Sequence, residues 1–161
     1  MIYSDAIQIA QRAHDLLAPR CYRLAIAGSL RRKAPDVGDI EIVAIPKPYD
    51  VGLFSTGIAE IVNQWKKVKG ELPCRYTQRM LPEGIKLDLF FATPKNWGYI
   101  YAIRTGSADF SKRLADGWVR NGYHGDDGML VDRAGNPIPC WEEEDLFRMA
   151  GIKFIPPEQR I

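Results

Sequence analysis

Residues 28–43 read GSLRRKAPDVGDIEIV, and this stretch guides the interpretation of the whole 161-residue sequence. It begins with a Gly-Ser pair, continues as a basic loop and ends in an apolar segment that contains two acids. In a strand, side chains two residues apart point to the same face, so Asp39 and Glu41 should project together while Ile40 and Ile42 enter the core. The stretch therefore predicts a loop that leads into a strand with two neighbouring carboxylates.

Paired carboxylates of this kind are typical of a divalent-cation site. Two ionised carboxylates side by side repel each other and raise each other's pKa, and a cation relieves that repulsion. Hard oxygen ligands suit Mg²⁺, which commonly takes one or two carboxylates plus substrate phosphates. Asp88, between two leucines on another predicted strand, is a candidate third ligand. The sequence thus predicts a site for two Mg²⁺ ions at Asp39, Glu41 and Asp88, with Mn²⁺ as an alternative ion.

The loop before this strand has the chemistry to hold phosphates. At Gly28 and Ser29, a flexible backbone with free amides and a hydroxyl can approach phosphate oxygens closely. Arg32 adds a planar guanidinium that suits a triphosphate. Phosphate donors beside metal-binding carboxylates are what nucleotidyl transfer requires, because its catalysis is mostly positioning and charge neutralisation. Each of these motifs by itself also has a plainer interpretation. Gly28-Ser29 can be an ordinary turn, Asp39 and Glu41 can lie on a solvated face of the sheet, and Asp88 can be a salt-bridge partner.

Outward from this stretch, helical and strand patterns predict an α+β fold. Strands are predicted over residues 23–27, 40–45, 75–81 and 86–92, with short strands and tight turns between 123 and 140. Helices are predicted over residues 5–17, 58–65, 96–103, 108–121 and 142–150, the last with an acidic first turn. The pattern changes after Pro94, so we expect two lobes, residues 1–94 and 95–161.

The composition is that of an ordinary globular protein. With 46% hydrophobic residues, 26% charged residues and a formal net charge of +2, it excludes disordered, collagenous and coiled-coil chains and indicates no nucleic-acid binding by itself. No apolar run approaches the roughly 20 residues that span a bilayer, and the first twenty residues lack a signal-peptide core. We therefore expect a cytoplasmic protein without membrane contact. Cys21, Cys74 and Cys140 form no CxxC pair and are expected to be reduced thiols.

In their order and spacing, these motifs resemble a known family. The Gly28-Ser29, Arg32, Asp39-x-Glu41 and Asp88 set is similar to the nucleotidyltransferase signature, and the form GSLRR…GDIEIV resembles the family X DNA polymerases of the polymerase beta type.

Two segments further along the chain carry the same resemblance. Residues 104–112, RTGSADFSK, resemble the family's Thr-Gly-Ser thumb segment, and residues 144–160, EDLFRMAGIKFIPPEQR, resemble its closing thumb sequence. The similarity therefore runs from about residue 22 to the C-terminus. It implies a nucleotidyltransferase palm over residues 1–94, with a mixed or antiparallel sheet and flanking helices, followed by a small α/β thumb over 95–161. Neither a lyase nor a fingers domain is expected.

The resemblance also implies a role for each site residue. Asp39 and Glu41 would bridge two Mg²⁺ ions, and Asp88 would complete the catalytic metal site beside the primer 3′-hydroxyl. The remaining roles fall on the phosphate loop and the thumb segment. Gly28, Ser29 and Arg32 would hold the phosphates of the nucleotide. Gly106 and Ser107 would lie under its sugar, with Thr105 supporting the turn, and Ser111 would face its base. Arg104 and Lys112 would contact the nucleic acid.

Two departures from the family pattern affect these expectations. Glu41 stands where the family more often has Asp, which adds a methylene group to a metal ligand. Ile103 and Arg104 stand where the family carries an aromatic pair that screens the sugar 2′-position. The sequence therefore leaves the choice between dNTP and NTP open.

Together these features predict a minimal DNA-directed DNA polymerase that fills gaps in DNA repair. The expected partners are gapped or nicked primer–template DNA, a dNTP or NTP, and an accessory DNA-binding protein that strengthens the grip on DNA; a monomer is expected. The small size is typical of polymerases carried by some viruses and phages. Two alternatives stay open: a nucleotidyltransferase acting on another acceptor, such as an RNA end or a protein, and a catalytically silent DNA-binding module.

Overall fold

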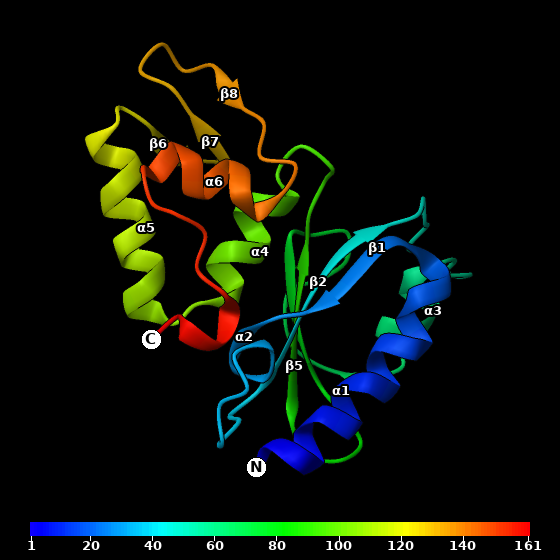
Figure 1. Ribbon diagram of the computed structural model, residues 1–161. Helices are drawn as coiled ribbons and strands as arrows, with labels where there is room; N and C mark the ends of the chain where they lie inside the picture. The colour runs from blue at the N-terminus through cyan, green and yellow to red at the C-terminus, as the bar shows by residue number, and fades with distance from the viewer. The chain divides into compact units, whose positions relative to one another are not determined.

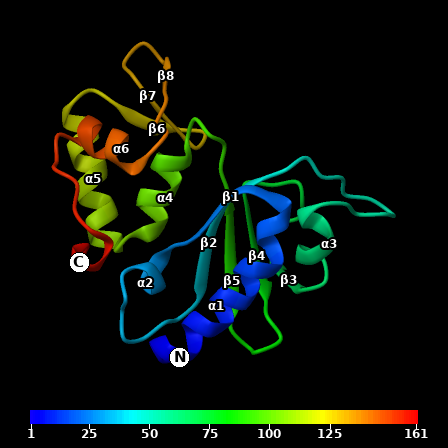
Figure 2. The same cartoon turned by 45° about the vertical axis from the view of Figure 1, so that its right-hand side comes forward.

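The computed structural model describes all 161 residues, which divide into two units, Met1–Ala92 and Thr93–Ile161 (Figures 1 and 2). The elements of the first unit are α1 (Tyr3–Leu17), η1 (Ala18–Arg20), β1 (Cys21–Ile26), α2 (Gly28–Arg31), β2 (Ile40–Pro46), α3 (Ile58–Val62), β3 (Lys66–Lys69), β4 (Tyr76–Met80) and β5 (Lys86–Phe91). Those of the second unit are α4 (Trp97–Thr105), α5 (Ala108–Arg120), β6 (His124–Asp126), β7 (Met129–Val131), β8 (Pro137–Ile138), α6 (Glu143–Ala150) and η2 (Pro157–Gln159). The α+β class predicted from the sequence is confirmed.

The first unit is built on a five-stranded mixed sheet with the order β1-β2-β5-β4-β3. Strands β2 and β5 run parallel, and all other neighbours run antiparallel. Helices α1 and α3 lie on one side of this sheet (Figures 1 and 2). They share a core with alternate strand positions, which includes Ala6, Ile9, Ala10, Leu17, Ile40, Ile42, Ile58, Val62, Leu87 and Leu89.

The strand register decides what the other side of the sheet carries. Glu41 on β2 is the cross-strand partner of Asp88 on β5, and Asp88 is in turn the partner of Gln78 on β4. Since side chains alternate along a strand, these three polar residues point away from the helices, on what is here named the carboxylate face. Asp39 lies just before β2 and two residues before Glu41, so its side chain points to the same face.

The second unit has its own core and a small antiparallel sheet with the order β6-β7-β8. Phe110 and Leu114 of α5 pack with Leu146 and Phe147 of α6 in this core. A capping box, in which Glu142 and Asp145 exchange hydrogen bonds with each other's backbone, begins α6. The acidic first turn predicted for this helix is therefore confirmed.

Several local predictions differ from the structure. The helix predicted over 58–65 ends at Val62, and Lys66–Lys69 then form the edge strand β3, which was not predicted because all four residues are exposed and three are lysines. Gly28 and Ser29, which the sequence predicts to lie in a loop, begin the short helix α2. The three cysteines are free, and none of the helices combines the length and apolar character that crossing a membrane requires.

Candidate functional site

Asp88 is the best-defined residue of the carboxylate face. It is only 8% exposed. Its Oδ1 accepts hydrogen bonds from Tyr76 Oη at 2.8 Å and from Gln78 Nε2 at 2.7 Å. Both donors lie on β4, two residues apart, and the Tyr76 ring stacks on Phe90 with a centroid distance of 5.0 Å. Two neutral donors thus hold one carboxylate oxygen, so the charge of Asp88 is oriented without being neutralised.

Asp39 is a neighbour of Asp88. Burial, and after it the negative charge of Asp88, raise the pKa of the Asp39 carboxyl. The positive charge of Lys86 acts in the opposite direction. Two acidic groups that repel each other in a half-buried position are the arrangement that a bound cation would relieve.

Glu41 shares the register position of Asp88, but its carboxylate is directed elsewhere. A Cβ added to Gly28 would lie 1.6 Å from Glu41 Oε2, so this carboxylate lies directly against the backbone that begins α2. Gly28 also has a φ of +60°, in the left-handed region that glycine tolerates best. The Gly-Ser segment and Glu41 are therefore in contact, and only a glycine fits between them.

The donor types of this face suit a hard divalent cation such as Mg²⁺. Asp39 and Asp88 supply neighbouring carboxylates, whereas Glu41 would have to turn from Gly28 toward Asp88 to join them. Across the whole chain, no three His, Cys, Asp or Glu side chains are grouped as ligands of one ion. The three acids predicted as metal ligands thus share one face, with two of them together and the third apart.

The other phosphate-loop residues lie close to this face. Ser29 is half-buried in α2, and its carbonyl accepts a hydrogen bond from the Ala34 amide at 2.9 Å, which closes the loop after the helix. Arg32 caps the C-terminal end of α2 and is half-buried. Because α2 packs on β2, the segment that carries both residues lies beside this strand.

In the second unit, the Gly106-Ser107 segment joins α4 to α5. Gly106, with a φ of +64°, ends α4, and a cis peptide bond links it to Ser107. Ser107 Oγ caps α5 by accepting a hydrogen bond from the Phe110 amide at 3.2 Å. Thr105 Oγ1 donates to the Tyr101 carbonyl at 2.7 Å, which stabilises the last turn of α4. The turn is therefore held by its own side chains.

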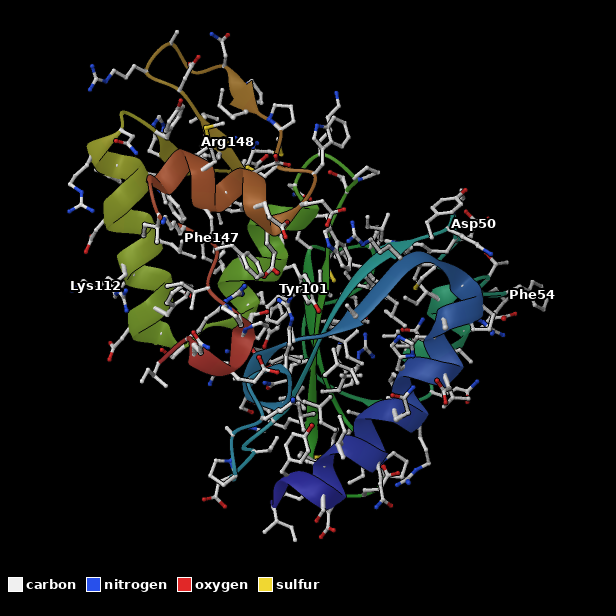
Figure 3. All side chains as sticks on the ribbon, in the orientation of Figure 1. Asp50, Phe54, Tyr101, Lys112, Phe147 and Arg148 are labelled. Carbon is white, nitrogen blue, oxygen red and sulfur yellow. The ribbon has the colours of Figure 1, made fainter.

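The remaining predicted site residues of this unit differ in exposure. Ser111 Oγ donates to the Ile103 carbonyl at 2.9 Å and so links α5 to α4. Lys112 is exposed on the outer side of α5 (Figure 3), and Arg104 is exposed near the end of α4. The two cations are accessible, whereas the Ser111 hydroxyl already makes an internal hydrogen bond.

Three residues around these sites were not identified from the sequence. Tyr76 and Gln78 hold Asp88, and their spacing of two on a predicted strand was the signal that could have pointed to a shared face. Arg160 is fully buried, and its Nη1 pairs with Glu143 Oε1 at 2.7 Å. Its carbonyl oxygen accepts a hydrogen bond from the Ser107 amide at 3.3 Å. Arg160 belongs to the closing segment that carries the family resemblance, but no local pattern in the sequence pointed to its buried ion pair with Glu143.

Comparison with known proteins gives one finding on family. Residues 101–161 match the family model of the DNA polymerase beta thumb. The matched segment contains Gly106, Ser107 and Arg160 and most of the second unit. No match was found among curated proteins. The thumb match supports a relationship to polymerase beta-like proteins of family X and a role connected with DNA.

Proposed function

We propose that this protein is a nucleotidyltransferase of the polymerase beta type that adds nucleotides to a primer 3′-hydroxyl, with gap filling in DNA repair as its role. The observation that carries the proposal is the register of β2 and β5, which sets Glu41 beside Asp88 with Asp39 next to them. The thumb match of residues 101–161 supports a DNA end as the acceptor.

Each residue of the carboxylate face has a role in this proposal. Asp39 and Asp88, with Glu41 once its carboxylate turns away from Gly28, would hold Mg²⁺ ions, which would supply charge neutralisation and lower the pKa of the attacking hydroxyl. Asp88, held through Oδ1 by Tyr76 and Gln78, would bind an ion through its other oxygen, which neither of these two hydrogen bonds uses. The backbone fit between Glu41 and Gly28 couples the metal-binding acids to the phosphate loop.

The phosphate loop and the second unit would hold the incoming nucleotide. The Gly28 backbone and the Ser29 hydroxyl would bind phosphate oxygens, and Arg32 would neutralise the triphosphate. Gly106, Ser107 and the start of α5 would hold the sugar and base. These roles require positioning rather than covalent chemistry, as phosphoryl-type transfer does in general.

Extension of a labelled primer on a one-nucleotide gapped duplex tests the proposal. The assay uses Mg²⁺ or Mn²⁺, low salt, and each dNTP and NTP separately. We expect templated addition that falls at least ~100-fold in Asp88→Asn, because one charged group of the metal site is lost. Asp50→Asn is the matched control: Asp50 is an exposed acid of the same unit (Figure 3) and should leave the rate unchanged.

Other outcomes select among the alternatives. Untemplated addition would indicate a terminal transferase, and the ratio of dNTP to NTP incorporation would determine the sugar preference. Metal-independent DNA binding without any addition would contradict the polymerase proposal and favour a DNA-binding module. Equal activity of Asp88→Asn and Asp50→Asn would show that Asp88 is not a catalytic residue.

A further inference from the structure

The carboxylate face of the first unit carries lysines as well as acids. In the register of β3, β4 and β5, Lys66 is the partner of Met80, and Met80 is the partner of Lys86. The three residues therefore form one row across the sheet. Met80 lies two residues after Gln78, which belongs to the carboxylate face, so the whole row points to that face.

The neighbouring row on the same face carries a third lysine and two of the acids. Lys69 of β3 is the partner of Gln78, and Gln78 is the partner of Asp88. Asp88 is in turn the partner of Glu41. Along this row the carboxylate face therefore changes from a cation at the edge of the sheet to acids at its centre.

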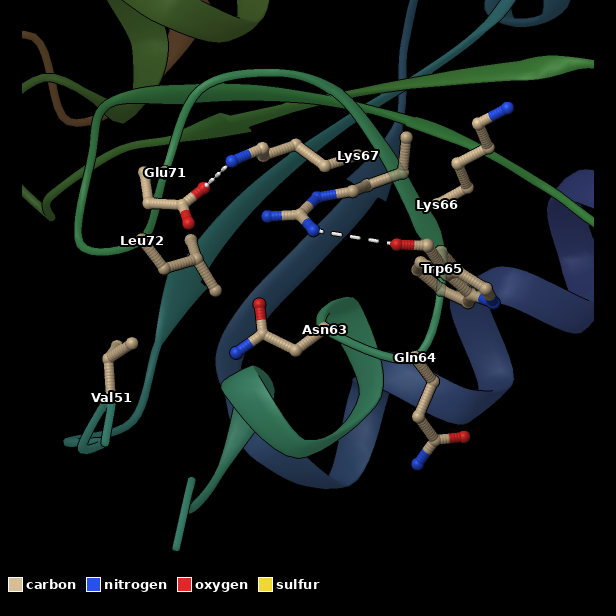
Figure 4. Close-up of a pocket in the computed structure, with 9 residues that line it drawn as sticks. Val51, Asn63, Gln64, Trp65, Lys66, Lys67, Glu71 and Leu72 are labelled. Atoms are coloured by element: carbon tan, nitrogen blue, oxygen red, sulfur yellow. Dashed lines mark hydrogen bonds and ion pairs between the residues drawn. The ribbon is translucent and has the colours of Figure 1, made fainter. Parts of the chain in front are cut away.

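A register shift in β3 brings Lys66 and Lys69 to the same face. The shift lies between Lys67 and Lys69 and gives β3 one extra residue. Lys67 points to the helix side, because its partner Arg79 alternates along β4 with the residues of the carboxylate face. In Figure 4, Lys67 extends toward Glu71, with which it forms an ion pair, and Lys66 extends in another direction.

Lys66, Lys69 and Lys86, here named the lysine patch, are all exposed. The side chains of Lys66 and Lys69 form no ion pair or hydrogen bond with the rest of the chain. The charge of Lys86 opposes the effect of burial and of Asp88 on the pKa of the Asp39 carboxyl, so Lys86 lies near the acids. The chain itself thus leaves most of the positive charge of the patch available to an anionic ligand.

We propose that the lysine patch binds backbone phosphates of the primer strand, whose 3′ end lies at Asp88. The terminal 3′-hydroxyl carries no charge and can approach the acids, whereas the phosphates of the same strand are repelled by the acids and attracted by the lysines. Phosphate neutralisation strengthens binding without any preference for sequence. The inference rests on the proposed function, because that function places the primer end at Asp88.

The dimensions of the sheet suit this path. Lys69 and Asp88 lie two strands apart, which is about 10 Å at the backbone. A few nucleotides of one strand cover this distance, and the long, flexible lysine side chains adapt to the phosphate positions. The lysines are positioning residues in this arrangement, since none of them touches the reacting atoms.

Binding of a fluorescently labelled one-nucleotide gapped duplex to the full chain, measured by anisotropy without divalent metal, tests the patch. We expect Lys66→Gln and Lys69→Gln each to weaken binding several-fold and to reduce the slope of log K against log salt by about one. Lys66→Arg should restore the affinity, because it keeps the charge. In primer extension, the two Gln variants should raise the KM for DNA and leave kcat unchanged.

Lys67→Gln is the matched control. Lys67 lies on the same strand and its loss makes the same change in charge, but its side chain is on the other side of the sheet. Its exposed ion pair with Glu71 contributes little to stability. Lys67→Gln should therefore keep the affinity and the salt slope of the unmodified protein. Equal losses of affinity in Lys66→Gln and Lys67→Gln would overturn the proposal.

Neutral methylphosphonates identify the strand that is bound. Replacement of the three phosphates nearest the primer 3′ end should weaken binding several-fold. Lys66→Gln should lose less affinity from this replacement, because one of the contacts is already absent. The same replacement in the template should affect both proteins equally. A loss that depends on Lys66 only when the template is modified would overturn the assignment to the primer.

Failure of this proposal and failure of the proposed function give different results. Templated addition by the unmodified protein, with Lys66→Gln and Lys69→Gln binding DNA as well as Lys67→Gln does, would overturn the lysine patch alone. DNA binding that depends on Lys66 and Lys69 without any nucleotide addition would support the patch as a DNA site and contradict the proposed function. Thermal unfolding checks that each variant folds, as expected for exposed positions.

Discussion

At the scale of the residue, the site depends on how one carboxylate is held. Asp88 is nearly buried, and a buried charge costs free energy unless it is hydrogen-bonded. Tyr76 and Gln78 satisfy Oδ1 without neutralising the charge. A carboxylate held by these two donors has a fixed orientation on the carboxylate face.

Tyr76→Phe removes one of these two hydrogen bonds and keeps the ring that stacks on Phe90. We expect the free energy of unfolding to fall by about 1 kcal/mol and primer extension to fall about 10-fold, because Asp88 loses part of its orientation. Urea unfolding and the gapped-primer assay measure the two effects. Tyr22→Phe, at a 70% exposed tyrosine, is the control; identical results for the two variants would disprove the role of the Tyr76 hydroxyl.

At the scale of the element, two glycines determine how the helices of the second unit pack. A Cβ on Gly98 of α4 would lie 2.1 Å from the Glu142 carbonyl oxygen, and one on Gly117 of α5 would lie 2.5 Å from the Ala150 carbonyl oxygen. These atoms belong to the N-terminal cap and the last residue of α6, so α4 and α5 each approach α6 at backbone distance. The close approach brings Phe110 and Phe147 into one core.

Gly98→Ala should destabilise the second unit by about 1–3 kcal/mol, because backbone rather than a flexible side chain would have to move. Denaturant unfolding followed by tryptophan fluorescence measures the loss, since Trp97 and Trp118 both lie in this unit. Gly52→Ala serves for comparison because a Cβ there meets no atom within 4 Å. If both variants unfold at the same denaturant concentration, the inferred close packing of α4 on α6 is wrong.

At the scale of the whole molecule, the chain consists of two units with separate cores. The second unit includes a buried ion pair between Arg160 and Glu143. The ring centroids of Phe110, Phe147 and Phe154 lie 5.0–5.5 Å from the guanidinium carbon of Arg160. The ion pair and the hydrogen bond from Arg160 Nε to the Ile155 carbonyl at 2.8 Å offset part of the cost of burying both charges, whereas Arg160 Nη2 has no hydrogen-bond partner. The pair ties the C-terminal segment to α6, and the Arg160 carbonyl ties it to Ser107.

Because its core is complete in itself, the segment Thr93–Ile161 should fold when produced alone, although a segment of this size has limited stability. Its ¹H–¹⁵N spectrum should be well dispersed and should overlay the signals of the core residues in the full chain. A spectrum with the narrow dispersion of an unfolded chain would show that the second unit depends on the first.

The sequence by itself determined the α+β class and those secondary-structure elements that have a local pattern. It also determined that the side chains of Asp39 and Glu41 point to one face of a strand and those of Ile40 and Ile42 to the other. These properties follow from alternation and helical spacing, which are local. Only the tertiary structure decided that Glu41 neighbours Asp88, that Tyr76 and Gln78 hold Asp88, and that Arg79 is buried on the helix side. Strand order and register join residues tens of positions apart, and an exposed lysine-rich edge strand such as β3 has no apolar alternation to reveal it.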